Sequence, residues 1–193
     1  MASKKESTFV TMVLTLFLVT FVASAALGYL YELTKGPIAE VKLAKQNAAI
    51  LQVVPEFDNE PTEESYTIDI DGGTLKFFPD KKNGELVGTA VNTFTTQGFS
   101  GEITLMVGFL PDGTINNISV LDHKETPGLG DKMQKNKSDW SVQFNGKNPT
   151  DFQLSVTKDG GDVDVITAST ISSRAFCDAV QRAYNAYMEG GKK

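Results

Sequence analysis

Residues 103–121, ITLMVGFLPDGTINNISVL, hold two apolar segments separated by a tight turn signal. The first segment, 103–110, is rich in residues that favour strands, and the second, 115–121, has the same character. Pro111, Asp112 and Gly113 between them are residues that favour turns. The stretch therefore predicts two consecutive antiparallel strands, and it makes a β-sheet the basis of the fold.

Further strand signals precede and follow this pair. Tyr66–Ile70 alternates between apolar and polar residues, residues 71–73 (DGG) predict a turn, and 74–78 returns as the second strand of a hairpin. Another strand is predicted at 86–94, which is rich in valine and threonine. Short additional strands are expected at 152–156 and 163–166.

An amphipathic helix is predicted from about residue 172 to 189, with Gly190 ending it. Its apolar residues recur at helical spacing on one face, namely Phe176, Ala179, Val180, Ala183, Tyr184 and Tyr187. Together the signals predict an α+β fold, in which one N-terminal transmembrane helix is followed by a single domain of antiparallel strands and helices.

The N-terminal part of the chain carries an uncharged run at residues 7–31. The 22 residues from Phe9 to Leu30 correspond to roughly 33 Å of helix, which is enough to cross the hydrocarbon core of a bilayer. Two lysines precede the run (Lys4 and Lys5), whereas the charges that follow it cancel. The positive-inside rule then predicts a cytoplasmic N-terminus and an extracytoplasmic domain in a single-pass membrane protein.

A cleaved signal peptide is the alternative interpretation, because Ala23-Ser24-Ala25 has the small residues of a cleavage site. The apolar run continues past that site to Leu30, which favours a retained anchor. Gly36-Pro37 is expected to end the membrane helix. The predicted organisation is a cytoplasmic N-terminus (1–8), a transmembrane helix (9–31), a connecting helix (32–56) and one domain (57–193).

Composition excludes several classes of protein. A net charge of −6 and a pI near 4.8 argue against a nucleic-acid-binding face, which needs clustered basic residues. A single cysteine, Cys177, excludes an internal disulfide and is expected to be a small buried residue. With one histidine and no cluster at ligand spacing, no metal site is predicted.

The segment Asp164-Val165-Ile166-Thr167-Ala168-Ser169-Thr170 lies directly before the predicted C-terminal helix. The N-terminus of a helix presents unpaired N–H groups and a partial positive charge, which favour a phosphate. Small side chains allow that phosphate to approach the backbone closely. The alternative is an ordinary helix cap rich in serine and threonine.

A second motif is His123-Lys124-Glu125-Thr126-Pro127-Gly128-Leu129-Gly130, which follows the strand that ends near residue 121. The proline and the glycines force a tight loop in which the backbone can approach a ligand. A plain surface turn is the alternative. His123 is a candidate proton donor to a ligand, although a lone histidine at the end of a strand is more often structural.

Both motifs resemble those of the FMN-binding domain family. In that family a flavin transferase esterifies FMN to the last threonine of the first motif, which is Thr170 here. The usual Ser-Gly-Ala-Thr core is Thr167-Ala168-Ser169-Thr170 in this chain, so small residues replace small residues. The resemblance implies that the loop 125–130 lies against the flavin, with Leu129 on the ring system. Residues 98–101 (GFSG) also resemble a loop of the family.

The order of anchor, loop motif and threonine motif resembles the G subunits of Rnf-type ion-translocating complexes, and next the longer C subunits of sodium-translocating NADH:quinone reductases. The resemblance implies an anchored electron-transfer protein of the bacterial inner membrane that carries covalent FMN, in a complex that couples ferredoxin and NAD. It also implies partners, namely other membrane proteins of the complex and, during maturation, a flavin transferase. The implied cofactor-binding residues are Asp164, Thr167, Ser169, Thr170, Glu125, Thr126, Gly128, Leu129 and Gly130.

Two other classes of function stay open from the residues alone. An anchored module could hold a non-covalent anionic ligand at the helix that begins near Thr170. A hydrolase could use Ser169 or Thr170 as its nucleophile, and would then need a general base such as His123 or a carboxylate. No complete active site is recognisable in the sequence, and no catalytic residue is predicted.

Overall fold

The computed structural model describes residues 8–190, and the chain divides into two compact units, Met1–Ala44 and Lys45–Lys193. Helix α1 runs from Phe9 to Val53 and therefore passes from the first unit into the second. It continues through Gly36-Pro37, so the predicted end of the membrane helix at this pair is wrong. Proline removes one backbone donor, but the remaining hydrogen bonds on both sides are enough to continue the helix.

The N-terminal part of α1 exposes its apolar side chains. Phe9, Phe17 and Leu27, for example, are 79%, 67% and 69% exposed. Within residues 8–190, α1 is the one helix long and apolar enough to cross a membrane. An exposed apolar surface of this length needs a non-aqueous environment, which agrees with the predicted anchor.

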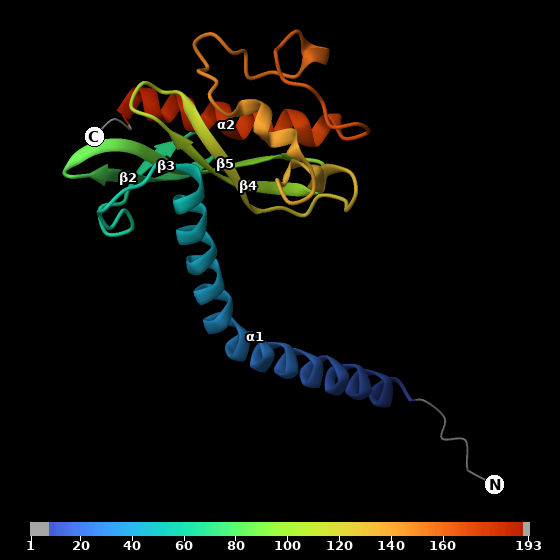
Figure 1. Cartoon of the computed structure of the whole chain (residues 1–193). Coiled ribbons are helices and arrows are strands. Elements are labelled where there is room, and N and C mark those ends of the chain that lie inside the picture. Colours follow the sequence, from blue (N-terminus) through green and yellow to red (C-terminus); the bar gives the residue numbers. More distant parts are fainter. Residues whose placement is uncertain (1–7, 191–193) are drawn as a thin grey trace. The chain divides into compact units, whose positions relative to one another are not determined.

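The second unit is built on a five-stranded antiparallel sheet whose strands follow the chain order β1-β2-β3-β4-β5 (Figure 1). The strands are β1 (Tyr66–Ile70), β2 (Gly73–Lys82), β3 (Glu85–Gly98), β4 (Gly101–Phe109) and β5 (Ile115–Asp122). The five strands predicted between residues 66 and 121 are thus confirmed. The two further strands predicted at 152–166 are wrong, because only a single bridge joins Val156 to Val163 there.

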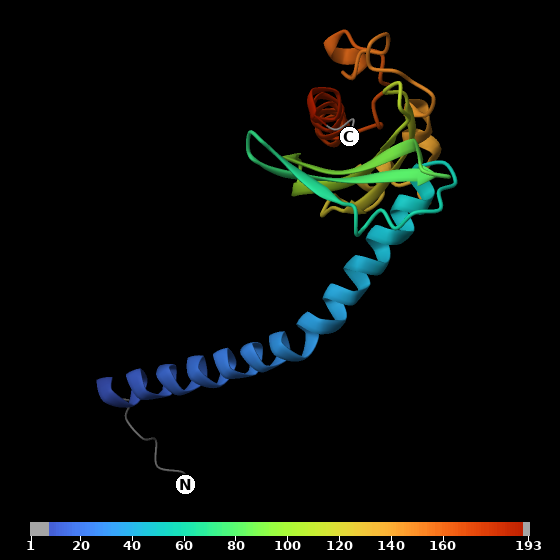
Figure 2. The same cartoon turned by 90° about the vertical axis from the view of Figure 1, so that its left-hand side faces the viewer.

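The sheet buries both of its faces, and β2 shows how. Leu75 and Phe77 belong to the core under helix α2 (Thr170–Gly190), whereas Phe78 points to the opposite face. On that opposite face the last turns of α1 pack on the sheet through Ile50 and Val53. Figure 2 shows α2 lying over one face of the sheet. The alternation along each strand thus serves two cores.

The connection from β5 to α2 is irregular and contains three short 3-10 helices, η1 (Gly130–Met133), η2 (Asp139–Phe144) and η3 (Thr157–Asp159). Aromatic rings attach it to α2, since Trp140 and Phe144 each lie 5.1 Å from the ring centre of Phe176. This packing returns the long connection to the N-terminal end of α2, where the candidate site is found.

Candidate functional site

Three segments that are far apart in the sequence meet around a cavity of about 340 Å³ at the start of α2. They are the tip of the β3–β4 hairpin, the loop 125–130 and the first turn of α2 with the residues before it. The lining residues are Phe99, Glu125, Thr126, Leu129, Gly130, Ala168, Ser169, Thr170, Ile171 and Ser172. The two sequence motifs, separated by about forty residues, are therefore brought together in one site.

The first turn of α2 has unused hydrogen-bond donors. Among the described residues, no acceptor is found for the backbone N–H groups of Thr170, Ile171 and Ser172. Ser169 accepts the first helical bond through its carbonyl oxygen, but its hydroxyl contacts the Ser172 hydroxyl at 2.8 Å instead of capping the helix. An ordinary side-chain cap therefore does not explain this segment, and the free donors can hold an anion.

Ala168 adopts a left-handed conformation, with φ of 61°. Glycine takes this conformation without steric cost, whereas alanine is strained there by about 1 kcal/mol. Glycine at this position, as in the Ser-Gly-Ala-Thr core that the segment resembles, would remove this strain. The turn brings Ser169 and Thr170 to the cavity, where Ser169 is buried and Thr170 is partly exposed.

Glu125 joins the three segments. Its carboxylate is buried, and Oε1 accepts a hydrogen bond from the Ser100 amide at 2.9 Å, while Oε2 accepts one from the Ser172 hydroxyl. Glycines make room for it, because a Cβ at Gly98 would lie 2.9 Å from Oε1 and a Cβ at Gly130 would lie 2.7 Å from Oε2. Glu125 thus positions the walls of the cavity and is committed to protein partners.

Glu125→Ala should lower the free energy of unfolding by about 3 kcal/mol, because it leaves the buried Ser172 hydroxyl and the partly buried Ser100 amide without their carboxylate acceptor. Denaturant unfolding followed by the fluorescence of Trp140 measures the change. Glu102→Ala, which removes an exposed glutamate from β4, is the matched control and should change stability by less than about 0.5 kcal/mol. Equal stability of the two variants would contradict the joining role of Glu125.

A cation lies beside the candidate acceptor hydroxyl. Lys158 Nζ donates a hydrogen bond to Thr170 Oγ1 at 3.1 Å. The neighbouring Asp159 forms a bidentate ion pair with Arg174, with both N–O distances at 2.7 Å, and this pair ties η3 to α2. Arg174 also holds the pKa of Asp159 below its usual value, mainly through these hydrogen bonds. Lys158 was not predicted, because it lies outside both motifs and no spacing in the sequence marks it.

Other residues of the two motifs lie outside the cavity lining. The Asp164 side chain is exposed, and its backbone oxygen accepts from Trp140 Nε1 at 2.6 Å. Thr167 is also exposed, and Gly128 adopts φ of 80° at the turn of its loop. His123 accepts a hydrogen bond from the Glu125 amide at 3.1 Å, and its other ring nitrogen contacts Gln134. These contacts give His123 a structural role in shaping the loop.

The part of the chain that forms this cavity matches a known protein family. The FMN-binding domain family matches residues 98–185, a range that begins at the β3–β4 hairpin and includes the loop 125–130 and most of α2. The chain is 39% identical to the G subunit of an ion-translocating oxidoreductase complex of Salmonella typhi over 160 residues, covering 79% of this chain and 78% of that protein.

Proteins with the same name in other bacteria are similar. The relative in Haemophilus influenzae (strain PittEE) is 37% identical over 161 residues, covering 80% of this chain and 78% of that protein. The relative in Stutzerimonas stutzeri is 34% identical over 177 residues, covering 88% of this chain and 77% of that protein. The expected resemblance is confirmed, and the chain belongs to the family of G subunits of ion-translocating oxidoreductase complexes, with an FMN-binding domain at residues 98–185.

Proposed function

We propose that this chain is a membrane-anchored electron-transfer protein that carries FMN as a phosphoester of Thr170, in a complex that couples ferredoxin and NAD to ion translocation. The observation that carries the proposal is the hydrogen bond from the Lys158 ammonium to the Thr170 hydroxyl, in the helix turn whose first N–H groups have no acceptor among the described residues. The relatives, which are named as G subunits of ion-translocating oxidoreductase complexes, support the assignment to such an assembly.

The cavity suits the two ends of FMN. The N–H groups of the first turn of α2 and the Lys158 ammonium would bind the phosphate. At the rim three apolar side chains are exposed, with Phe99 at 67%, Leu129 at 39% and Ile171 at 47%. Their surface would receive an aromatic ring system. When bound, the flavin supplies one- and two-electron chemistry, while these residues supply its position and surroundings.

Attachment requires one covalent step. The Thr170 oxygen forms a bond to the FMN phosphorus of FAD, the pyrophosphate P–O bond breaks, AMP leaves, and the hydroxyl proton passes to a base of the transferase. The product is a phosphodiester with one negative charge, which a single lysine can balance. We propose that the transferase reads the exposed side chains of Asp164 and Thr167, which lie outside the cavity lining and are free to meet another protein.

Lys158→Gln should slow the attachment of flavin to Thr170 about tenfold, because the charge that faces the acceptor oxygen and the phosphate is lost. The measurement is a time course of covalent flavin formation, using chain made in a host without the transferase, to which transferase and FAD are added. Lys147→Gln removes the same charge elsewhere and should react at the wild-type rate. An unchanged rate for Lys158→Gln would remove Lys158 from the site.

We propose further that the domain lies outside the cytoplasm and that α1 is retained as its anchor. The length and exposure of the apolar part of α1 support the anchor, and the lysines before it support the direction. Protease added to spheroplasts should digest the domain from about residue 37 onward. The mature protein should begin near Met1 and should sediment with membranes after a salt wash. A free protein with its N-terminus at Ala26 would show a cleaved signal instead.

One experiment separates the proposed function from the other two classes. Wild-type protein is purified, denatured and washed, and its visible absorbance is recorded. Covalent flavin stays with the chain and keeps it yellow, whereas an anion-binding module or a hydrolase would be colourless. Colourless wild-type protein from a host that contains the transferase would refute the proposal.

A further inference from the structure

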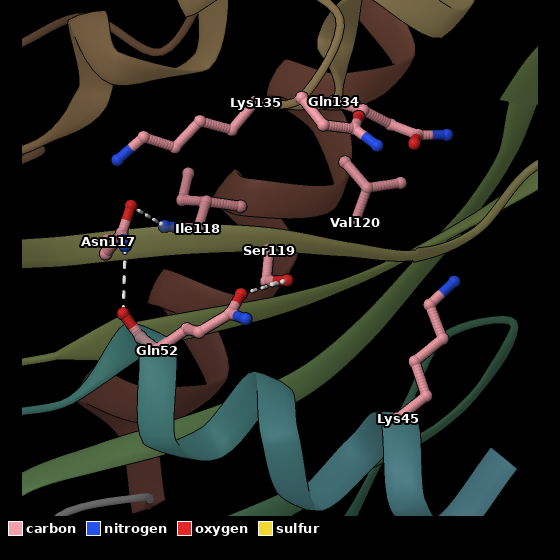
Figure 3. Close-up of a pocket in the computed structure, with 9 residues that line it drawn as sticks. Lys45, Gln52, Asn117, Ile118, Ser119, Val120, Gln134 and Lys135 are labelled. Atoms are coloured by element: carbon pink, nitrogen blue, oxygen red, sulfur yellow. Dashed lines mark hydrogen bonds between the residues drawn. The ribbon is translucent and has the colours of Figure 1, made fainter. Parts of the chain in front are cut away.

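A second and larger cavity, of about 650 Å³, follows the outer edge of β5 (Figure 3). Residues 117–120 of β5 form its floor, and residues 134–136 flank it on one side. On the other side lie Lys45 and Gln52 from the last turns of α1, which belong to the same compact unit as the sheet. This cavity is named the β5 groove below, and it shares no lining residue with the candidate flavin site.

The edge that forms the groove has backbone groups available for pairing. β5 is the last strand of the sheet, and only its first residue, Ile115, pairs outward, with Gly146 and Lys147. Within residues 8–190 no other backbone segment pairs with this edge. The Ile118 amide donates a hydrogen bond to the Asn117 side chain at 3.0 Å, which indicates that it points outward. By the alternation of an antiparallel ladder, the N–H and C=O of Val120 point outward as well.

The walls of the groove are polar and carry positive charge. Lys45 and Lys135 flank it, and the side chains of Gln52, Asn117 and Gln134 line it, with Asn117 Nδ2 already donating to the Gln52 carbonyl oxygen at 2.9 Å. Lys45 already donates to the carbonyl oxygen of Leu121, which fixes its ammonium beside the strand. In a chain with a net charge of −6, two lysines beside an open strand edge form a local site for an anionic partner.

We propose that the β5 groove receives an extended acidic segment of another protein of the complex, which adds a sixth strand to the sheet at β5. An exposed strand edge is a template for such addition, and main-chain pairing gives affinity while flanking side chains select the partner. The lysines select for carboxylates, and the amides on both walls suit the polar groups of an extended chain. The proposal rests on the proposed membership of a membrane complex, but the groove is independent of the flavin.

Val120→Pro tests the proposal most directly, because it removes an outward N–H group that the sheet itself does not use. Proline is tolerated at such positions of an edge strand. Full-length protein is purified from its own membranes, and the amount of other membrane proteins of the complex retained per chain is measured. Retention should fall at least tenfold for Val120→Pro and for Lys45→Glu combined with Lys135→Glu. Lys76→Glu combined with Lys82→Glu makes the same charge change on β2 and should retain partners as the wild type does.

Two direct readouts identify the occupant. Amide hydrogen exchange at Val120 should be at least tenfold slower in the membrane complex than in the isolated full-length chain. A photo-crosslinker placed at the exposed position Lys135 should join an acidic segment of a different chain, identified by mass spectrometry. Crosslinks to lipid or to a second copy of this chain, or unchanged retention in folded Val120→Pro, would overturn the proposal.

The covalent flavin content keeps the two proposals separate. Wild-type protein that is yellow but has unprotected β5 amides in the complex would overturn the groove proposal alone. Wild-type protein with protected amides and no covalent flavin would overturn the attachment at Thr170 alone.

Discussion

Thr170→Ala should yield folded protein with no covalent flavin. The substitution removes the hydroxyl oxygen in the first turn of α2 that accepts a hydrogen bond from Lys158. Thr170 is partly exposed and makes no buried contact through that oxygen, so the free energy of unfolding should stay within about 1 kcal/mol of the wild type. The ratio of flavin to protein absorbance after denaturation measures the loss, which should be complete.

Two neighbouring variants make this result specific to the acceptor. Thr170→Ser keeps a hydroxyl at the same place and should retain part of the flavin. Ser169→Ala removes the other nearby hydroxyl, which contacts Ser172 at 2.8 Å, and should retain most of it. If Thr170→Ala stayed yellow and Ser169→Ala became colourless, Ser169 would be the acceptor.

Asp80→Asn should stabilise the domain strongly at pH 8 and hardly at all at pH 4. Asp80 is fully buried in β2, where its Oδ2 accepts one hydrogen bond from the Ala90 amide at 3.1 Å and its Oδ1 has no partner. Burial raises the pKa of this carboxyl to about 7 from an ordinary value of 3.8. The folded protein therefore holds a proton that the unfolded chain has released between these two pKa values.

The direction in which stability changes with pH follows from this difference between the two pKa values. The contribution of Asp80 to the stability of the wild type is greatest below pH 4 and falls as the pH rises toward 7, with an upper limit of about 4 kcal/mol for the total loss. Asparagine stays neutral, so its advantage should grow over the same range. Denaturant unfolding of the full chain in detergent at pH 4, 6 and 8, followed through Trp140, measures it. If the free energies of unfolding of the two proteins changed in parallel with pH, Asp80 would not be protonated in the folded protein at these pH values.

The sheet was predictable because its signals are local. Alternation in Tyr66–Ile70 and turn residues such as Pro111 and Gly113 act over a few positions, and the structure confirms all five strands between residues 66 and 121. The segments 152–156 and 163–166 also carry apolar residues, but these are buried in the core of the domain without forming strands, and a single bridge joins Val156 to Val163. The path of α1 through Pro37 likewise depended on the helix on both sides of the proline.

The candidate site was predictable only in part. The motifs at 125–130 and 164–170 marked the right segments, but they could not show that Glu125 holds Ser100 and Ser172 together. Nor could they show that Lys158 reaches Thr170, since that contact depends on how η3 lies against α2. The roles of Asp164, Thr167 and Gly128 toward FMN stay predictions.

The joining role of Glu125 has a consequence for the order of events in biogenesis. Its two hydrogen bonds connect residues 100, 125 and 172, so the cavity exists only after the β3–β4 hairpin, the loop that follows β5 and the C-terminal helix have come together. A nascent or damaged chain offers the threonine without its surroundings. Attachment of the cofactor would therefore come after folding, and the yellow colour of a chain would indicate that its domain had folded correctly.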